Sequence, residues 1–234
     1  MKTTLLLVFP VFALSLGFGV QASAQLQDPS KPLSSITFIA KKATAYDLIL
    51  AVARQSRVPI GIVVGQDQKA LFGTTRAYKV KEEAPREALM EATVGTGYSL
   101  EEVGGVFVFS AGDLTSRQYQ LLTHSYENFG SNAPQTMALL SATLNMWLKF
   151  ASDEETGQRA GYGGSILGSL DDEEFVIKPL PSANTEQIAN RIVTLGSKGM
   201  WIFRVAPTTP ADSTGDEITI KPYQEFAREA TPRR

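Results

Sequence analysis

The stretch Ile36–Val64, ITFIAKKATAYDLILAVARQSRVPIGIVV, has the pattern of a strand, a helix and a second strand. Its first residues, Ile36–Ala40, are mostly β-branched or aromatic, which is typical of a strand. Apolar residues then recur at the spacing of one helical face, at Ala45, Leu48, Ile49, Val52 and Ala53. Thr44 followed three residues later by Asp47 predicts a helix N-terminus of the capping-box type. Pro59 predicts that the helix has ended, because a residue before proline disfavours helical geometry.

The same kinds of element continue to residue 110. Ile60–Val64 and Thr74–Val80 are predicted strands, and Pro85 suits the first turn of a second helix, where its missing N–H costs nothing. Gly104-Gly105 is a two-residue hairpin signal. The strands on either side of it are Tyr98–Val103 and Val106–Phe109. The predicted order is β-α-β-β-α-β-β, an α+β sandwich of two layers with the helices on one face of a sheet.

Five short motifs in this order carry a resemblance to a known family. They are Thr44–Ile49 (TAYDLI), Gln55–Ile60 (QSRVPI), Pro85–Leu89 (PREAL), Gly95–Tyr98 (GTGY) and the final strand Val106–Phe109. The run from Ile36 to Ser110 resembles the short N-terminal domain of secretins and of signalling TonB-dependent receptors, the STN domain. The resemblance implies a periplasmic, Gram-negative setting and a role without catalysis. It also implies binding to another envelope protein, such as a signalling regulator, a secretion channel or an outer-membrane component.

Residues 1–24 have the composition of a secretory leader. Lys2 gives a positive start, an apolar run extends from Leu5 to Val20, and Ala22-Ser23-Ala24 is a signal-peptidase pattern. The run contains Pro10 and is short for a bilayer span. We therefore expect cleavage after Ala24 and a mature chain in the periplasm with no transmembrane segment; an uncleaved N-terminal anchor is the alternative.

Composition excludes several functional classes. The 234 residues include 22 basic and 24 acidic side chains, one His and no Cys, for a net charge of −2. Without Cys there are no disulfides, thiol nucleophiles or thiolate metal sites. A nearly neutral chain without a basic block argues against nucleic-acid binding, which depends on neutralising phosphates. We expect no cofactor and no bound metal.

The second half is expected to contain a long apolar helix over residues 132–150. Pro134 follows a helix-start signal at Ser131-Asn132-Ala133, and the chain is then uncharged as far as Lys149. Apolar residues fall both on one stripe and beside it, which is typical of a buried helix. A face that contacts a partner is the other interpretation, and for it we select Leu144, Trp147 and Phe150 as interface residues. Dimers or rings formed through this helix are a further hypothesis.

The remaining elements suggest a repeat. Strands are expected at Phe175–Lys178, Met200–Val205 and Ile218–Ile220, with a helix starting at Asn184. Aligning Thr44, Ala84 and Asn184 superimposes three amphipathic helix starts, so the second half is either a degenerate copy of the first or a chance match. We expect a linker at 25–34, the STN-like domain at 35–112, a second, smaller α+β region at 113–205, and a strand with a flexible Pro-rich, charged tail at 206–234.

Two groups of residues could carry chemistry. His124 is the only imidazole and has Ser125 beside it, but a Ser–His–carboxylate arrangement also needs a positioned acid, and sequence neighbours seldom face each other correctly. Acidic runs at Asp153–Glu155 and Asp171–Glu174 flank the Gly-rich segment Gly161–Gly164. They suggest a glycoside hydrolase or a glycan-binding protein as the alternative function, with Trp147, Trp201 and Tyr162 as stacking residues. Trp201 lies within a predicted strand next to Ile202, which favours a position in the core for this side chain. The leading prediction remains a protein-interaction module that is not an enzyme, with no catalytic residues.

Overall fold

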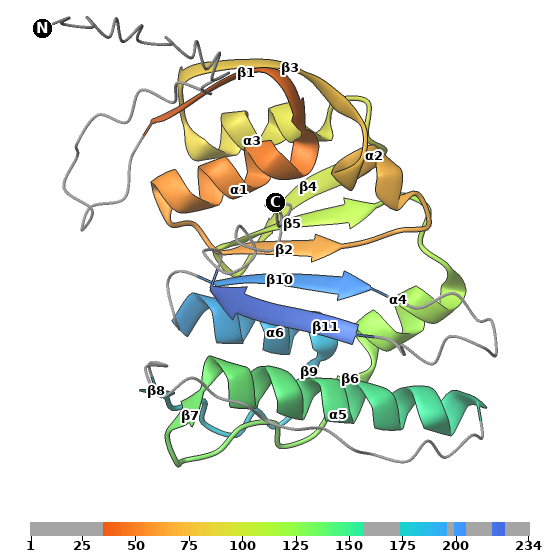
Figure 1. The fold of residues 1–234 in the computed structure, drawn as a ribbon. Helices are drawn as coiled ribbons and strands as arrows, with labels where there is room; N and C mark the ends of the chain where they lie inside the picture. Colours follow the sequence, from red (N-terminus) through yellow and green to blue (C-terminus); the bar gives the residue numbers. More distant parts are fainter. Residues whose placement is uncertain (1–34, 157–173, 196–198, 205–216, 223–234) are drawn as a thin grey trace, which may run out of the picture.

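The protein is a mixed α/β structure, described here from a computed structural model over residues 35–156, 174–195, 199–204 and 217–222 (Figure 1). Its helices are α1 (Ala45–Ser56), α2 (Gln68–Phe72), α3 (Pro85–Thr93), α4 (Ser116–Thr123), α5 (Met137–Thr156) and α6 (Thr185–Leu195). Its longer strands are β1 (Ile36–Thr44), β2 (Ile60–Val63), β3 (Thr75–Glu83), β4 (Tyr98–Val103), β5 (Val106–Ala111), β10 (Gly199–Arg204) and β11 (Glu217–Pro222). Its two-residue strands are β6 (Ser125–Tyr126), β7 (Gln135–Thr136), β8 (Glu174–Phe175) and β9 (Ala183–Asn184).

One five-stranded sheet runs through both halves of the chain. Its strand order is β11-β10-β2-β5-β4, with β10, β2 and β5 parallel and the two outer strands antiparallel to their neighbours. Strand β10 from the second half therefore pairs directly with β2 from the first. The Gly104-Gly105 turn between β4 and β5 has positive φ at both residues, as a tight two-residue hairpin requires.

Each face of this sheet supports its own hydrophobic core. Successive side chains in a strand point to opposite faces, so Ile62 and Ile202 join α1 and α3 on one face. Val63 and Phe203 join α4, α5 and α6 on the other. Figure 1 shows the two groups of helices on opposite sides of the sheet.

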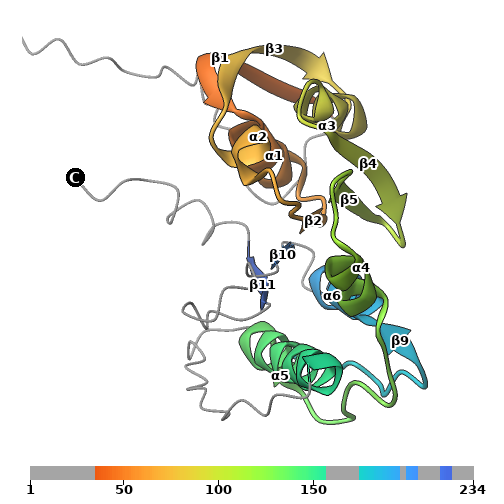
Figure 2. The same ribbon diagram turned by 90° about the vertical axis from the view of Figure 1, so that its right-hand side faces the viewer.

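The first group of helices is covered a second time by a two-stranded ribbon. β1 and β3 pair only with each other within the described residues, in antiparallel register. The ribbon arches over α1 and α3 (Figure 2), and Ile36, Tyr78 and Val80 on it are buried in the same core. The guanidinium of Arg76 on β3 ties the ribbon to α3 by donating to the carbonyls of Val94 and Glu91 at the helix end.

The units containing α1–β2 and α6–β10 are built alike. Thr44 Oγ1 accepts from Asp47 N (3.1 Å), and Asp47 Oδ2 accepts from Thr44 N (2.8 Å). Asn184 Oδ1 accepts from Gln187 N (2.8 Å), and Gln187 Oε1 accepts from Asn184 N (3.0 Å). The sequence of buried and exposed positions is also shared along the two helices, apart from one half-buried position in α1 that is exposed in α6.

The strands that follow the two helices, β2 and β10, also match each other position by position. Ile60 pairs with Met200 and Ile62 with Ile202, and the interval along the chain that separates these partners also separates Thr44 from Asn184. This agrees with the predicted repeat for these two units. The third proposed member is weaker, because Ala84 makes no side-chain cap.

One pair of positions distinguishes the two units. Where the first has Leu50 and Gly61, the second has Asn190 and Trp201. The indole of Trp201 is completely buried and lies against Gly61, where the Cβ of any other residue would overlap the ring. Its Nε1 donates to Asn190 Oδ1 at 2.8 Å. Gly61 therefore provides the space for Trp201 at the centre of the sheet, and the predicted core position of Trp201 is confirmed.

The β11 edge of the sheet is closed by a side chain. Asn145 on α5 donates from Nδ2 to Ile218 O (2.6 Å) and accepts at Oδ1 from Ile218 N (2.7 Å). The amide thus takes the place of a further strand at this residue. Covering an edge with a helix is a known protection against unwanted strand pairing.

The predicted long apolar helix over 132–150 is wrong in its start and its character. Gln135 and Thr136 pair with β8 as β7, so α5 begins only at Met137. It buries a single stripe, namely Met137, Leu140, Leu144, Leu148 and Ala151. No helix among the described residues is long and apolar enough to cross a membrane.

The predicted two-layer arrangement with helices on one face of the sheet differs from the structure. β1 and β3 form a separate ribbon outside the central sheet, and helices cover both faces of that sheet. The remaining differences are local. The strand predicted at Phe175–Lys178 is reduced to Glu174–Phe175, and α2 and α4 were not predicted. The leader, the 25–34 linker, the Gly161–Gly164 segment and most of the tail lie outside the described residues.

Candidate functional site

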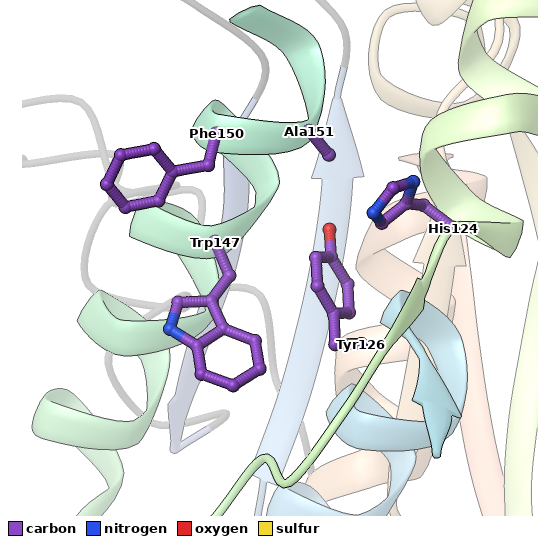
Figure 3. Close-up of a pocket in the computed structure, with 5 residues that line it drawn as sticks. All are labelled: His124, Tyr126, Trp147, Phe150 and Ala151. Atoms are coloured by element: carbon purple, nitrogen blue, oxygen red, sulfur yellow. The ribbon is translucent and has the colours of Figure 1, made fainter. Parts of the chain in front are cut away.

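An open cavity of about 190 Å³ lies between α5 and the segment that follows α4 (Figure 3). Its lining residues are His124, Tyr126, Trp147, Phe150 and Ala151. Four of these five side chains are ring systems, and they come from two segments that are about twenty residues apart in sequence. The cavity therefore depends on how α5 is seated against the rest of the protein.

The rings form a connected series. His124 and Tyr126 have ring centroids 4.9 Å apart, and Tyr126 and Trp147 have centroids 5.6 Å apart. Phe129 meets Trp147 edge to face, with ring centroids 5.4 Å apart. Such offset and edge-on arrangements are favourable for aromatic pairs and hold each ring in one orientation. Phe150 lies at the outer side of α5, pointing away from His124 (Figure 3).

Helix α4 places the first segment of the cavity. A reciprocal cap between Thr115 and Gln118 starts this helix. The buried amide of Gln118 then donates to Val64 O at 2.9 Å, which attaches α4 to the end of β2. At the other end, Thr185 Oγ1 donates to Leu121 O at 2.7 Å and so joins α4 to α6.

Tyr126 is the fixed polar group of the cavity. It is almost completely buried, and its hydroxyl lies 3.4 Å from Thr185 Oγ1. Burial raises the pKa of the Tyr126 phenol above its ordinary value, and the Thr185 hydroxyl opposes that shift. The phenol is therefore neutral at physiological pH and keeps its hydrogen-bond donor.

Helix α5 supplies the other wall and an exposed extension. Its buried stripe seats it on the second core, while Trp147 on the neighbouring face is half-buried over the cavity. Met146 and Phe150, one helical turn apart, are 44% and 45% exposed. Together with Trp147 they form what we call the α5 aromatic patch, an apolar surface continuous with the cavity.

The structure places the three selected interface residues differently. Leu144 is completely buried in the second core, so it supports α5 from within. Trp147 and Phe150 line the cavity and are accessible. The interface prediction itself stays a prediction for these two residues.

His124 and Ser125 do not point at a common target. His124 packs on Tyr126, whereas Ser125 Oγ lies 2.7 Å from Ser182 Oγ across the β6–β9 pair. Within the described residues no carboxylate lines the cavity, and no group of three or more His, Asp or Glu side chains is placed to hold a metal ion.

The acidic runs are mostly beyond what the structure describes. Asp171–Glu173 and the side chains of Asp153–Glu155 lie outside the described residues, and Glu174 is exposed on β8. The role of these acidic runs in a hydrolase site therefore stays a prediction from the sequence.

Sequence reasoning missed Tyr126 and Phe129 as site residues. Both lie in the short segment between α4 and α5, whose sequence has no periodicity, so nothing in the local pattern distinguishes them from loop residues. Their aromatic character close to the only His was the one available signal.

Comparisons with protein-family models, curated proteins and solved structures find no match to this chain.

Proposed function

We propose that this chain is an exported, non-catalytic protein-interaction module that binds an envelope protein through the α5 aromatic patch and its cavity. The observation that carries the proposal is the exposed series of rings at Trp147 and Phe150 around an open cavity. Aromatic side chains beside a small depression are typical centres of protein interfaces, where they supply large contact area at low entropic cost. The partner inserts one apolar or aromatic side chain into the cavity.

The resemblance to the STN domain supports the same proposal. Between Ile36 and Ala111 the elements follow one another as β1, α1, β2, α2, β3, α3, β4 and β5, an order compatible with that family apart from the short α2. The family implies a periplasmic location, which agrees with the predicted leader. The proposed partner is accordingly a signalling regulator, a secretion channel or an outer-membrane component.

Affinity capture from envelope extract tests the proposal. Trp147→Ala and Phe150→Ala are compared with Met90→Ala, since Met90 on α3 is 54% exposed and so is a matched apolar surface residue. We expect the wild type and Met90→Ala to retain the same discrete protein and the two α5 variants to lose most of it. Equal capture by all four proteins would contradict the proposal.

Glycan binding is the second candidate. The rings of Trp147 and Phe150 at an open cavity offer stacking surfaces of the kind that suits sugars, and His124 and Tyr126 offer hydrogen-bond groups beside them. Titration with soluble cell-wall fragments, followed by Trp fluorescence, separates the two candidates. Saturable quenching that disappears in Trp147→Ala would favour the glycan; no response together with specific protein capture favours the module. If the fragments are instead cleaved, the chain is a hydrolase.

A further inference from the structure

The two edge strands of the central sheet differ in whether their outward backbone groups have hydrogen-bond partners. The β11 edge is occupied at Ile218 by the Asn145 amide. The opposite edge is β4, which pairs only with β5 within the described residues. An open strand edge presents unpaired N–H and C=O groups that can accept a further strand.

The hairpin geometry shows which groups of β4 point outward. Val103 and Val106 close the two-residue turn as a hydrogen-bonded pair, and pairs alternate from there along the ladder. Glu102 therefore lies opposite Phe107 at a position where backbone groups point away from the partner strand. In agreement, the Phe107 N–H donates to Pro59 O on the β2 side (3.1 Å). The N–H and C=O of Leu100 and Glu102 consequently face the open edge.

Acidic side chains stand on both faces of this edge. Glu102 points to the first core face, where Arg86 on α3 pairs with it at 3.4 Å. Glu101 points to the other face, towards Glu186 at the start of α6. Burial and the charge of Glu101 together raise the pKa of Glu186, while the Asn190 amide opposes this. Within the described residues, neither Glu101 nor Glu186 is joined to a basic side chain in an ion pair.

We propose that β4 accepts an extended, lysine- or arginine-rich segment of a partner protein as a sixth strand. Backbone pairing at Leu100 and Glu102 would supply affinity, as in other cases of strand addition. Basic side chains on one face of the added strand would lie beside Glu101 and Glu186 and neutralise them. This inference rests on the proposed role in protein binding but uses a surface separate from the α5 aromatic patch.

A second copy of the chain does not fit this edge. Antiparallel pairing of two β4 strands would bring Glu101 and Glu102 of one copy close to the same residues of the other. Like charges directly opposite each other on paired strands are destabilising. The charge of the edge thus favours a basic partner over self-association.

The test uses three labelled synthetic peptides and the purified protein. The first alternates Lys and Val, the second replaces Lys by Gln, and the third keeps every Lys but replaces Val by Pro, which cannot form the strand ladder. Binding is measured by fluorescence anisotropy, and its site by amide shifts in NMR spectra of the protein. We expect binding of the first peptide only, with the largest shifts at Leu100 and Glu102.

Variants then separate backbone pairing from charge. Glu102→Pro removes an outward N–H without removing a β4–β5 hydrogen bond, and we expect it to abolish binding. Glu101→Gln and Glu186→Gln should each weaken binding about three- to fivefold, the size expected for a partly exposed ion pair. Glu91→Gln, an exposed glutamate on α3, should leave it unchanged. If Glu102→Pro fails to fold, the charge variants and the shift map still decide.

Several results would overturn the inference: equal binding of the Pro-containing peptide, shifts mapping away from β4, no binding of the first peptide, or a dimer that Glu102→Pro disrupts. Repeating the titration with Trp147→Ala distinguishes the two proposals, because this variant should bind the peptide normally. Loss of peptide binding in Trp147→Ala would mean that the peptide occupies the cavity, which also overturns the inference.

Discussion

Helices α1 and α6 pack on opposite faces of one sheet. Both begin with the same kind of reciprocal N-cap, at Thr44–Asp47 and at Asn184–Gln187. Each then leads into a strand, and these strands, β2 and β10, pair side by side. The outer layers differ. The β1–β3 ribbon covers α1, whereas α6 is covered by α4 and α5 (Figure 2), and α5 carries the exposed rings of the cavity. The helix–strand units α1–β2 and α6–β10 therefore form similar inner layers on the two faces. The candidate site lies on α5, in an outer layer that differs between the two faces.

The largest expected effect on stability comes from adding a side chain at Gly61, the position that corresponds to Trp201 in the other unit. Gly61→Val places two methyl groups and a Cβ where the indole lies, and overpacking of this kind should lower the free energy of unfolding by about 3 kcal/mol. Urea unfolding measures it. In the Trp201→Leu background the added cost of Gly61→Val should be smaller by at least about 1 kcal/mol, because contacting residues are coupled. Additive effects would show that the two side chains do not compete for the same space.

A smaller loss of stability is expected at the contact between α5 and β11. Asn145→Ala leaves both backbone groups of Ile218 without their partner, which should cost about 1–3 kcal/mol. Because the cavity depends on the position of α5, capture of the partner should weaken as well. Asn145→Asp is the sharper control, since it keeps an acceptor for Ile218 N but loses the donor to Ile218 O. If the unfolding midpoint of Asn145→Ala equals that of wild type, the closed edge has no role in stability.

Cap variants compare the two units directly. Thr44→Ala and Asn184→Ala each remove one side-chain acceptor, and each should lower the free energy of unfolding by about 1 kcal/mol. Ala84 provides the contrast, because this residue makes no side-chain cap at α3, and Ala84→Ser should be neutral or slightly stabilising. A cost at only one of the two capped helices would argue that the units are less alike than their hydrogen bonds indicate.

The smallest expected effect concerns Glu186, which occupies the place that Tyr46 has in α1. Its pKa is raised in the folded protein by burial and by Glu101, so the folded state binds the proton more tightly than the unfolded chain does. Stability from this group is therefore present at acidic pH, below the ordinary glutamate pKa, and is lost as pH rises through the folded pKa. Glu186→Gln should stabilise at pH 7 by less than about 1 kcal/mol. The gain should vanish near pH 4; a gain of equal size at both pH values would assign it to another cause.

Features formed by neighbours in the sequence could be predicted, whereas features that need contact between distant segments could not. The α1 and α6 caps, the Gly104-Gly105 turn and the core position of Trp201 follow local patterns, and the structure confirms them. The start of α5 was misplaced because β7 forms only through pairing with β8, which is distant in sequence. The cavity has the same origin. Trp147 was selected from the main apolar stripe of the helix and Phe150 from beside that stripe, but Tyr126 reaches them only through α4, α6 and the β6–β9 pair.

The most direct test of the central claim is site-specific photo-cross-linking in living cells. A photoreactive phenylalanine analogue at position 150 is compared with the same analogue at position 90 on α3, a somewhat more exposed apolar site on the opposite face of the sheet. The proposal predicts a discrete cross-linked envelope protein from position 150, absent from position 90 and lost when Trp147→Ala is added. The same products from both positions, or none from position 150, would contradict a protein-binding role for the α5 aromatic patch.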